Sequence, residues 1–157
     1  MGCATQFVKG DAAGPAGELI VWDLGEGKAR WQVAEERQTL RSVAIHPTEP
    51  VVAAGAGDGT VGVYDLETGR ELRRLRGHTG DVTALALGPR GDRLLSGGTD
   101  RTVRLWDWKA GQPVLILEGH GGPVRAVAFA PDGRSVASTS GGSFLEVNEV
   151  RLWQAAR

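Results

Sequence analysis

At 157 residues the chain is long enough for one domain with an ordinary hydrophobic core. Hydrophobic residues make up 41% of it and charged residues 24%, which is typical of a globular protein and excludes wholesale disorder. The net charge of −1 gives no electrostatic reason to expect nucleic acid or an anionic membrane surface as a partner, and we expect neither.

Cys3 is the single cysteine, so an intrachain disulfide and a thiolate zinc cluster are excluded, and a reducing compartment, the cytoplasm, is the expected location. No apolar run approaches the roughly 20 residues of a membrane span. The N-terminus has no basic segment followed by an apolar one, so we expect no signal peptide.

Short strands separated by turns are predicted along the whole chain. In chain order they are GCATQFV at 2–8, ELIVWDL at 18–24, ARWQV at 29–33, LRSVAIH at 40–46, VVAAG at 51–55, TVGVYDL at 60–66, ELRRLR at 71–76, VTALAL at 82–87, RLLSGG at 93–98, VRLWD at 103–107, PVLILE at 113–118, VRAVAFA at 124–130, RSVAS at 134–138 and EVRLW at 149–153. These runs are bounded by Gly, Pro, Asp or Asn and lack helical periodicity. The pattern predicts an all-β protein of consecutive antiparallel strands.

The strand at 82–87 is apolar on both faces. Because side chains alternate along a strand, Val82, Ala84 and Ala86 share one face, while Thr83, Leu85 and Leu87 share the other. Both sets are largely apolar, so we expect both faces of the sheet to be buried. Small sheets stacked around an axis, each packed on the next, would have this property.

Two residue pairs recur at a fixed spacing of 42. Gly77-His78 is followed by Gly119-His120, and Trp22-Asp23, Tyr64-Asp65 and Trp106-Asp107 follow one another at the same interval. With four strands in each unit, the chain resembles the WD-repeat β-propeller family. The resemblance implies an open arc of about four blades with about 14 antiparallel strands.

The resemblance also divides the chain into repeat units. The implied units are blade 1 with strands b, c and d at 3–34, blade 2 at 39–76, blade 3 at 81–118, and blade 4 with strands a, b and c at 123–154. A propeller of this family most often has seven blades, so we interpret the chain as an arc of a larger ring or as one that a second copy completes. Open blade edges make self-association possible.

Four polar residues of blade 3 need an interpretation. His78, Ser96 and Asp100 have the residue types of a Ser-His-Asp nucleophile site. No Gly-x-Ser-x-Gly turn presents Ser96, however, and the resemblance assigns these residues, with Trp106, to a structural tetrad of buried hydrogen bonds. We therefore expect no catalytic, cofactor or metal site.

The tetrad is incomplete in the neighbouring blades. In blade 4, His120, Ser138 and Trp153 occupy matching positions, while the acid position falls in an insertion where Glu146, Asn148 and Glu149 are candidates. In blade 2, Asp58 and Tyr64 stand at the Asp and Trp positions. Glu36 stands at the His position there.

The family most often receives a partner on the side where the d–a loops and b–c turns emerge. Matching positions here are Thr39, Arg41, Gly57, Asp81, Thr83, Thr99, Pro123 and Arg125. Phe144 and Leu145 add apolar side chains on the longer loop of the fourth unit.

We therefore predict a non-catalytic scaffold that binds a protein or peptide partner whose identity the residues do not specify. One alternative is that the chain is the regulatory propeller of a larger signalling enzyme, such as a kinase or hydrolase. Another is a self-assembling half-propeller. The basic run ELRRLR at 71–76 fits an outer strand with edge charges better than a nucleic-acid site.

Overall fold

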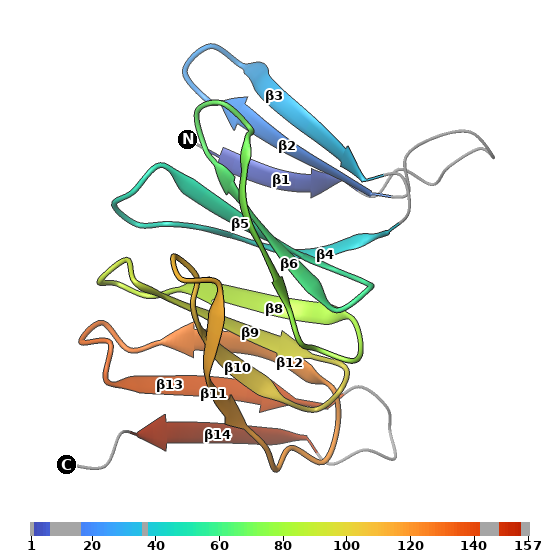
Figure 1. Cartoon of the computed structure of the whole chain (residues 1–157), viewed down its shortest axis with the longest axis vertical. Coiled ribbons are helices and arrows are strands. Elements are labelled where there is room, and N and C mark those ends of the chain that lie inside the picture. The colour runs from blue at the N-terminus through green and yellow to red at the C-terminus, as the bar shows by residue number, and fades with distance from the viewer. Residues whose placement is uncertain (1, 7–16, 36–37, 142–147, 155–157) are drawn as a thin grey trace.

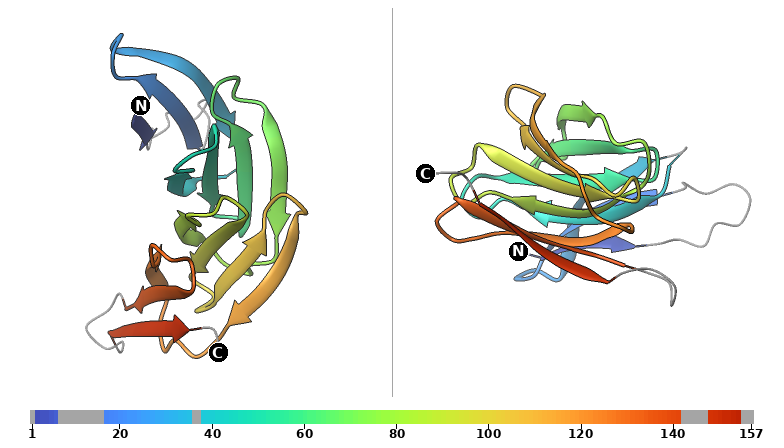
Figure 2. Two further views of the ribbon diagram at one scale, coloured as in Figure 1. Left: turned by 90° about the vertical axis from the view of Figure 1, so that its left-hand side faces the viewer. Right: turned by 90° about the horizontal axis from the view of Figure 1, so that it is seen from below.

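The computed structural model describes residues 2–6, 17–35, 38–141 and 148–154 of the chain. Within these residues the backbone forms 14 strands arranged in four sheets. The sheets stack one behind the other into an open arc (Figure 1 and Figure 2). The prediction of an all-β fold that forms an open propeller arc of about four blades is therefore confirmed.

Each sheet is a run of consecutive strands in which all neighbours are antiparallel. The first sheet contains β1 (Gly2–Gln6), β2 (Gly17–Asp23) and β3 (Lys28–Glu35). The second contains β4 (Leu40–Ile45), β5 (Val51–Ala56), β6 (Thr60–Asp65) and β7 (Glu71–Arg76). The third contains β8 (Val82–Leu87), β9 (Arg93–Gly98), β10 (Val103–Asp107) and β11 (Gln112–Leu117). The fourth contains β12 (Val124–Phe129), β13 (Ser135–Ser140) and β14 (Glu149–Gln154).

Three tight turns repeat at 42-residue intervals, and each starts at an Asp that ends β2, β6 or β10. The carbonyls of Asp23, Asp65 and Asp107 each accept a hydrogen bond from the backbone N–H of the Gly four residues later, at 2.8, 2.9 and 2.8 Å. The carboxylate of Asp65 also accepts from the N–H of Thr68 at 2.8 Å. Gly69 closes its turn with φ 73°, in the left-handed region that favours glycine. This turn explains why Asp and Gly recur at this spacing.

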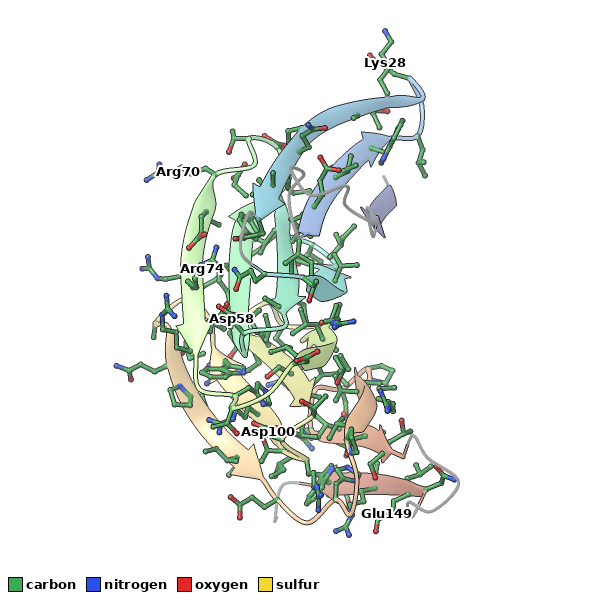
Figure 3. The ribbon with its side chains drawn as sticks, turned by 90° about the vertical axis from the view of Figure 1, so that its right-hand side faces the viewer. Lys28, Asp58, Arg70, Arg74, Asp100 and Glu149 are labelled. Atoms are coloured by element: carbon green, nitrogen blue, oxygen red, sulfur yellow. The ribbon has the colours of Figure 1, made fainter. Side chains whose placement is uncertain are left out.

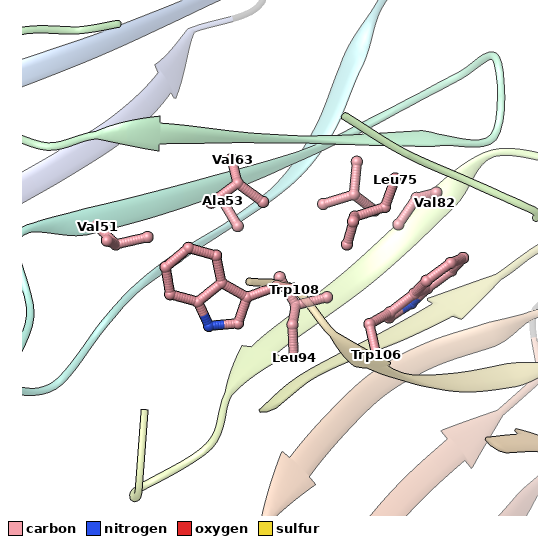
Figure 4. Close-up of a cluster of buried hydrophobic side chains, with 9 residues drawn as sticks. Val51, Ala53, Val63, Leu75, Val82, Leu94, Trp106 and Trp108 are labelled. Atoms are coloured by element: carbon pink, nitrogen blue, oxygen red, sulfur yellow. The ribbon is translucent and has the colours of Figure 1, made fainter. Parts of the chain in front are cut away.

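A continuous apolar core lies between the second and third sheets (Figure 4). Its buried members are Val51, Ala53, Val61, Val63 and Leu75 from the second sheet, and Val82, Leu94, Trp106 and Trp108 from the third sheet and the turn after β10. Members on one strand are two residues apart, because alternate side chains face the same side. Full burial of an aliphatic side chain of this size stabilises the fold by about 1.5–3 kcal/mol.

The other two interfaces between sheets differ in how completely they are buried. Leu19 and Val21 of the first sheet pack on Leu40 and Val52 of the second in a well-buried cluster. Between the third and fourth sheets the fully buried cluster consists of Leu95, Val103 and Val124, surrounded by partly buried side chains. The described part of the chain contains no helix that is long and apolar enough to cross a membrane.

Candidate functional site

Four polar side chains of the third sheet form one chain of hydrogen bonds, which we call the third-sheet tetrad. Trp106 Nε1 on β10 donates to Ser96 Oγ on β9 at 2.8 Å, and that oxygen lies 2.7 Å from His78 Nε2. His78 Nδ1 lies 2.9 and 3.0 Å from the two carboxylate oxygens of Asp100. The tetrad therefore joins two adjacent strands to the loop before β8 and to the turn after β9.

The tetrad geometry specifies the protonation of His78. Because an ionised carboxylate only accepts, Nδ1 carries a hydrogen and donates it to Asp100, so Nε2 accepts from the Ser96 hydroxyl. Burial lowers the pKa of His78, against the attraction of Asp100. Burial alone would raise the pKa of Asp100, but His78 and the backbone N–H of Thr79 lower it on balance. A neutral imidazole therefore faces a carboxylate at neutral pH.

The tetrad has the residue types of a nucleophilic site without an accessible nucleophile. Ser96 is 0% exposed, and its oxygen already accepts the indole N–H of Trp106. A substrate carbonyl could reach this oxygen only if the sheets separated. The chemistry that the arrangement supports is the pairing of buried polar groups, which holds the loop and the turn against the strands.

The fourth sheet contains a related network. His120 Nε2 lies 2.7 Å from Ser138 Oγ, which also accepts from Trp153 Nε1 at 2.8 Å. Glu149 supplies the acid, with Oε2 3.2 Å from His120 Nδ1. A hydrogen bond from Arg151 is the main reason why the pKa of Glu149 is lowered. The insertion thus places a Glu on β14 near the place that Asp100 takes in the third sheet.

The second sheet has a different network at the corresponding place. The Tyr64 hydroxyl lies 3.1 Å from Glu35 Oε1, and Arg74 Nη2 on β7 donates to the same carboxylate oxygen at 2.8 Å. Arg74 also pairs with Glu71. Glu35 ends β3, so these contacts tie the first sheet to the second. Glu36 lies outside the described residues.

Gly62 makes room for the Tyr64 ring, because a Cβ at Gly62 would lie 2.6 Å from Tyr64 Cε2. The third sheet has Arg104 at this point of the strand, 42 residues later. Asp58 closes its own turn by accepting from the Thr60 hydroxyl at 2.7 Å and from its backbone N–H at 3.0 Å. Asp58, Asp100 and Glu149 follow one another along the arc (Figure 3).

Sequence reasoning missed Glu35 and Arg74. Arg74 reads as an exposed charge on an outer strand, yet three neighbouring groups raise its pKa. The hydrogen bond to Glu71 contributes most, burial opposes it, and Glu35 and Tyr64 raise the pKa further. Burial is also the main reason why the pKa of Tyr64 is raised. The sequence did contain a signal for this network. Gly62 and Tyr64 stand where the third sheet has Arg104 and Trp106, 42 residues later.

In the second, third and fourth sheets, a backbone hydrogen bond joins two loops. It connects the loop before the first strand (β4, β8 or β12) to the turn after the second strand (β5, β9 or β13). Gly57 N donates to Thr39 O at 2.8 Å, Thr99 N to Asp81 O at 2.9 Å, and Gly141 N to Pro123 O at 3.1 Å. Donors and acceptors each recur at intervals of 42 residues. We call these three contacts the loop clamps. The loop clamps hold five of the candidate partner-binding residues at corresponding places along the arc: Thr39, Gly57, Asp81, Thr99 and Pro123.

A shallow groove of about 340 Å³ crosses β4, β8 and β12, the strands on the concave side of the arc (Figure 2). It brings together Arg41, Thr83 and Arg125, which are 42 residues apart. Arg41 Nε lies 3.1 Å from Asp81 Oδ2, and Arg125 Nε donates to the carbonyl of Gly141 at 2.6 Å. The Thr83 hydroxyl donates to carbonyls of β9 and β12. The two arginines are thus the exposed polar groups of this groove.

Phe144 and Leu145 lie outside the described residues, so their role as partner contacts stays a prediction. The described residues contain no group of three or more His, Cys, Asp or Glu side chains that could hold a metal ion.

Comparison with known protein families gives one result. The family model described as "WD domain, G-beta repeat" matches residues 32–65, 69–107 and 111–145, which together are more than half of the chain. No curated protein matches the chain.

Proposed function

The chain belongs to the WD-repeat family, whose repeats generally mediate contacts between proteins, and from this premise we propose that it is a non-catalytic protein-interaction module. Its repeat units are residues 3–34, 39–76, 81–118 and 123–154. Its binding surface, which we call the loop face, consists of Thr39, Arg41, Gly57, Asp81, Thr83, Thr99, Pro123 and Arg125.

The loop clamps are the observation that carries this proposal. Each clamp holds a loop against the neighbouring turn through backbone atoms at 2.8–3.1 Å, and the same contact occurs in three sheets. A surface that is already ordered loses less conformational entropy when a partner binds. The clamps use main-chain groups, so they leave the side chains of Thr39, Asp81 and Thr99 to determine which partner is recognised.

The charged pair at the groove has the properties of a contact that a partner can replace. Arg41 and Asp81 keep 44% and 36% of their side-chain surface exposed. An ion pair this exposed contributes about 0–1 kcal/mol, so exchanging it for a partner's charged groups costs little. Arg125 adds a second guanidinium at the equivalent position of β12.

The proposal is tested by capture on the immobilised chain, with bound proteins quantified from an extract of the organism that encodes it. The variant R41A/R125A removes two positive charges from the loop face. We expect the specific partner to be retained about 5- to 100-fold less well, as for interface residues worth about 1–3 kcal/mol.

The matched control is K28A/R70A, which removes two positive charges at the other ends of the strands, from the first residue of β3 and from the residue before β7 (Figure 3). This control should retain the partner as the unmodified chain does. Capture that falls equally in both double variants, or in neither, would show that the loop face is not the binding surface.

A further inference from the structure

Three polar residues on the concave side of the arc are β-bulge residues. Arg41, Thr83 and Arg125 each lie at a register shift, so they have no partner residue on β5, β9 or β13. The residue before each of them is almost completely buried. A bulge leaves its extra residue outside the ladder and re-aims the side chain. The three bulges therefore explain why one polar position in each innermost strand lines the shallow groove across β4, β8 and β12.

The opening of this groove is a property of the sheets that form it. β4 and β8 are the innermost strands of the two four-stranded sheets, and β12 is the innermost strand of the fourth sheet. Further sheets in the same arc would lie beside the first or the fourth sheet, as blades do around a central channel. They would leave the concave side of β4, β8 and β12 open (Figure 2).

Two guanidinium groups give the groove a positive charge. Arg41 and Arg125 are the charged residues that line it, and no carboxylate lines it in the described part of the chain. Asp81 beside the groove lies 3.1 Å from Arg41 Nε and offsets one of the two charges. Arg125 Nε donates to the carbonyl of Gly141 at 2.6 Å. Each arginine is thus held through Nε, which leaves its Nη groups to donate to a ligand.

The middle of the groove has no free hydroxyl donor. The Thr83 hydroxyl hydrogen is shared between the carbonyls of Gly97 at 3.2 Å and Val124 at 2.5 Å. Ser42, the other hydroxyl residue of the groove, donates to the carbonyl of Val82 at 2.9 Å. A carboxylate placed between the two arginines would therefore lose hydration without gaining a hydrogen bond from these side chains. The groove favours acids at its two ends and neutral residues between them.

We propose that the groove binds an extended segment of the partner protein in which two acidic clusters flank a short neutral run. This inference rests on the proposed function, because it names the chemistry that one part of the loop face recognises. Neighbouring sheets pack about 10 Å apart, so β4 and β12, with β8 between them, are about 20 Å apart. An extended chain rises about 3.3 Å per residue, so acids about six residues apart reach both arginines.

A nucleic-acid strand fits this groove less well than a protein segment. Proteins that bind single strands combine a basic groove with aromatic side chains on which the bases stack. Among the described residues that line this groove, none is aromatic. The net charge of the whole chain, −1, also gives no general attraction for a polyanion. Carboxylates of a protein segment are therefore the ligand that we infer.

The test is an NMR titration of the whole chain with the peptide GEEAGSAEEG, recording arginine Nε–Hε and backbone amide signals. We expect saturable shifts of the Arg41 and Arg125 signals. R41Q/R125Q should weaken binding by about four- to twentyfold, because two exposed ion pairs are lost. The matched control K28Q/R70Q removes two charges at the other ends of the strands and should change binding less than about twofold.

Asp81→Asn should change the affinity in the opposite direction. It removes the carboxylate that competes with the ligand for Arg41, so GEEAGSAEEG should bind about two- to fivefold more tightly at low ionic strength. The matched control is Asp92→Asn, which changes the net charge equally. Asp92 is 54% exposed and lies beyond the opposite end of β8, so binding should change less than about 1.5-fold.

A second peptide, GEEEEAGSAG, has the same composition with its acids in one cluster. It reaches one arginine at a time, so it should bind about threefold more weakly or worse. This comparison uses the unmodified chain, and it decides the question if a variant does not fold. Equal affinities of the two peptides would overturn the proposal.

Three further outcomes would also overturn it. These are no saturable shift of the two arginine signals, equal weakening in R41Q/R125Q and K28Q/R70Q, and equal affinities of the Asp81→Asn and Asp92→Asn variants. Tighter binding of a thymidine octanucleotide than of GEEAGSAEEG would assign the groove to nucleic acid instead.

Failure of this inference can be distinguished from failure of the proposed function. If R41A/R125A loses the captured partner but the unmodified chain does not bind GEEAGSAEEG, the loop face stands and the acidic segment is wrong. If the peptide binds as expected but capture is unchanged in R41A/R125A, the acid-binding groove stands and its role in capturing that partner is wrong.

Discussion

Ser96→Ala removes the one oxygen shared by two buried groups of the third-sheet tetrad. The Ser96 hydroxyl accepts the indole N–H of Trp106 at 2.8 Å and lies 2.7 Å from His78 Nε2. Ser96 and Trp106 are 0% and 1% exposed, and His78 is also buried, so water cannot replace the lost oxygen. The substitution therefore leaves two buried polar groups without partners.

The expected cost follows from these two groups. Leaving one buried donor or acceptor unsatisfied costs about 1–3 kcal/mol, so two of them would cost about 2–6 kcal/mol. Removal of the hydroxyl, which no longer has to be buried, offsets part of this loss. We expect Ser96→Ala to lower the free energy of unfolding by about 2–4 kcal/mol.

Ser138→Ala is the matched comparison. Ser138 Oγ has the same two partners, His120 Nε2 at 2.7 Å and Trp153 Nε1 at 2.8 Å. Trp153 is only half-buried, so water can reach its N–H when the serine is removed. We expect a smaller loss there, of about 1–2 kcal/mol.

Urea unfolding of both variants, followed by circular dichroism and tryptophan fluorescence, measures the difference. A loss below about 1 kcal/mol for Ser96→Ala would refute the reasoning, because it would mean that the buried groups find other partners. Equal losses in the two variants would also refute it, since burial of the indole is what separates them.

Three further predictions use the same urea assay. Gly62→Ala should cost about 1–3 kcal/mol, because the added methyl overlaps the Tyr64 ring, and an unchanged midpoint would contradict this. Glu35→Gln should cost about 1–3 kcal/mol, because it removes the charge from a pair with Arg74 whose side chains are only 21% and 16% exposed; an unchanged midpoint would show that the bridge between the first two sheets does not contribute to stability. The pKa of His78 is lower in the folded chain than its ordinary value of 6.5, so the unfolded chain binds more protons and stability should decrease as the pH falls below about 6.5. His78→Gln, compared between pH 5.5 and 7.5, should have a smaller slope, and an unchanged slope would assign the pH dependence to other groups.

Much of the fold could be predicted from the sequence because its causes are local. Runs of Val, Leu, Ile and Ala between turn residues predict strands, and the Asp and Gly of each tight turn recur at a spacing of 42. His78, Ser96, Asp100 and Trp106 could be selected for the same reason, since each has a defined place in a strand or turn of one repeat. Because the same residue types recur every 42 residues, the assignment of a strand or turn does not depend on one residue alone.

The candidate site was less predictable where the repeat is irregular. The insertion before β14 left three candidates for the acid position of the fourth sheet, Glu146, Asn148 and Glu149, and the structure has Glu149 Oε2 3.2 Å from His120 Nδ1. Thr83 was selected for a partner, but its hydroxyl also bonds carbonyls of β9 and β12. Counting along one repeat cannot reveal such contacts, because they depend on the adjoining sheet.

The sequence by itself determined the strands, the turns and the repeat, because hydrophobic alternation and turn chemistry act over a few residues. Only the tertiary structure decided which side chains meet between sheets. Glu35 and Arg74 are 39 residues apart and belong to different sheets, yet they lie 2.8 Å from each other.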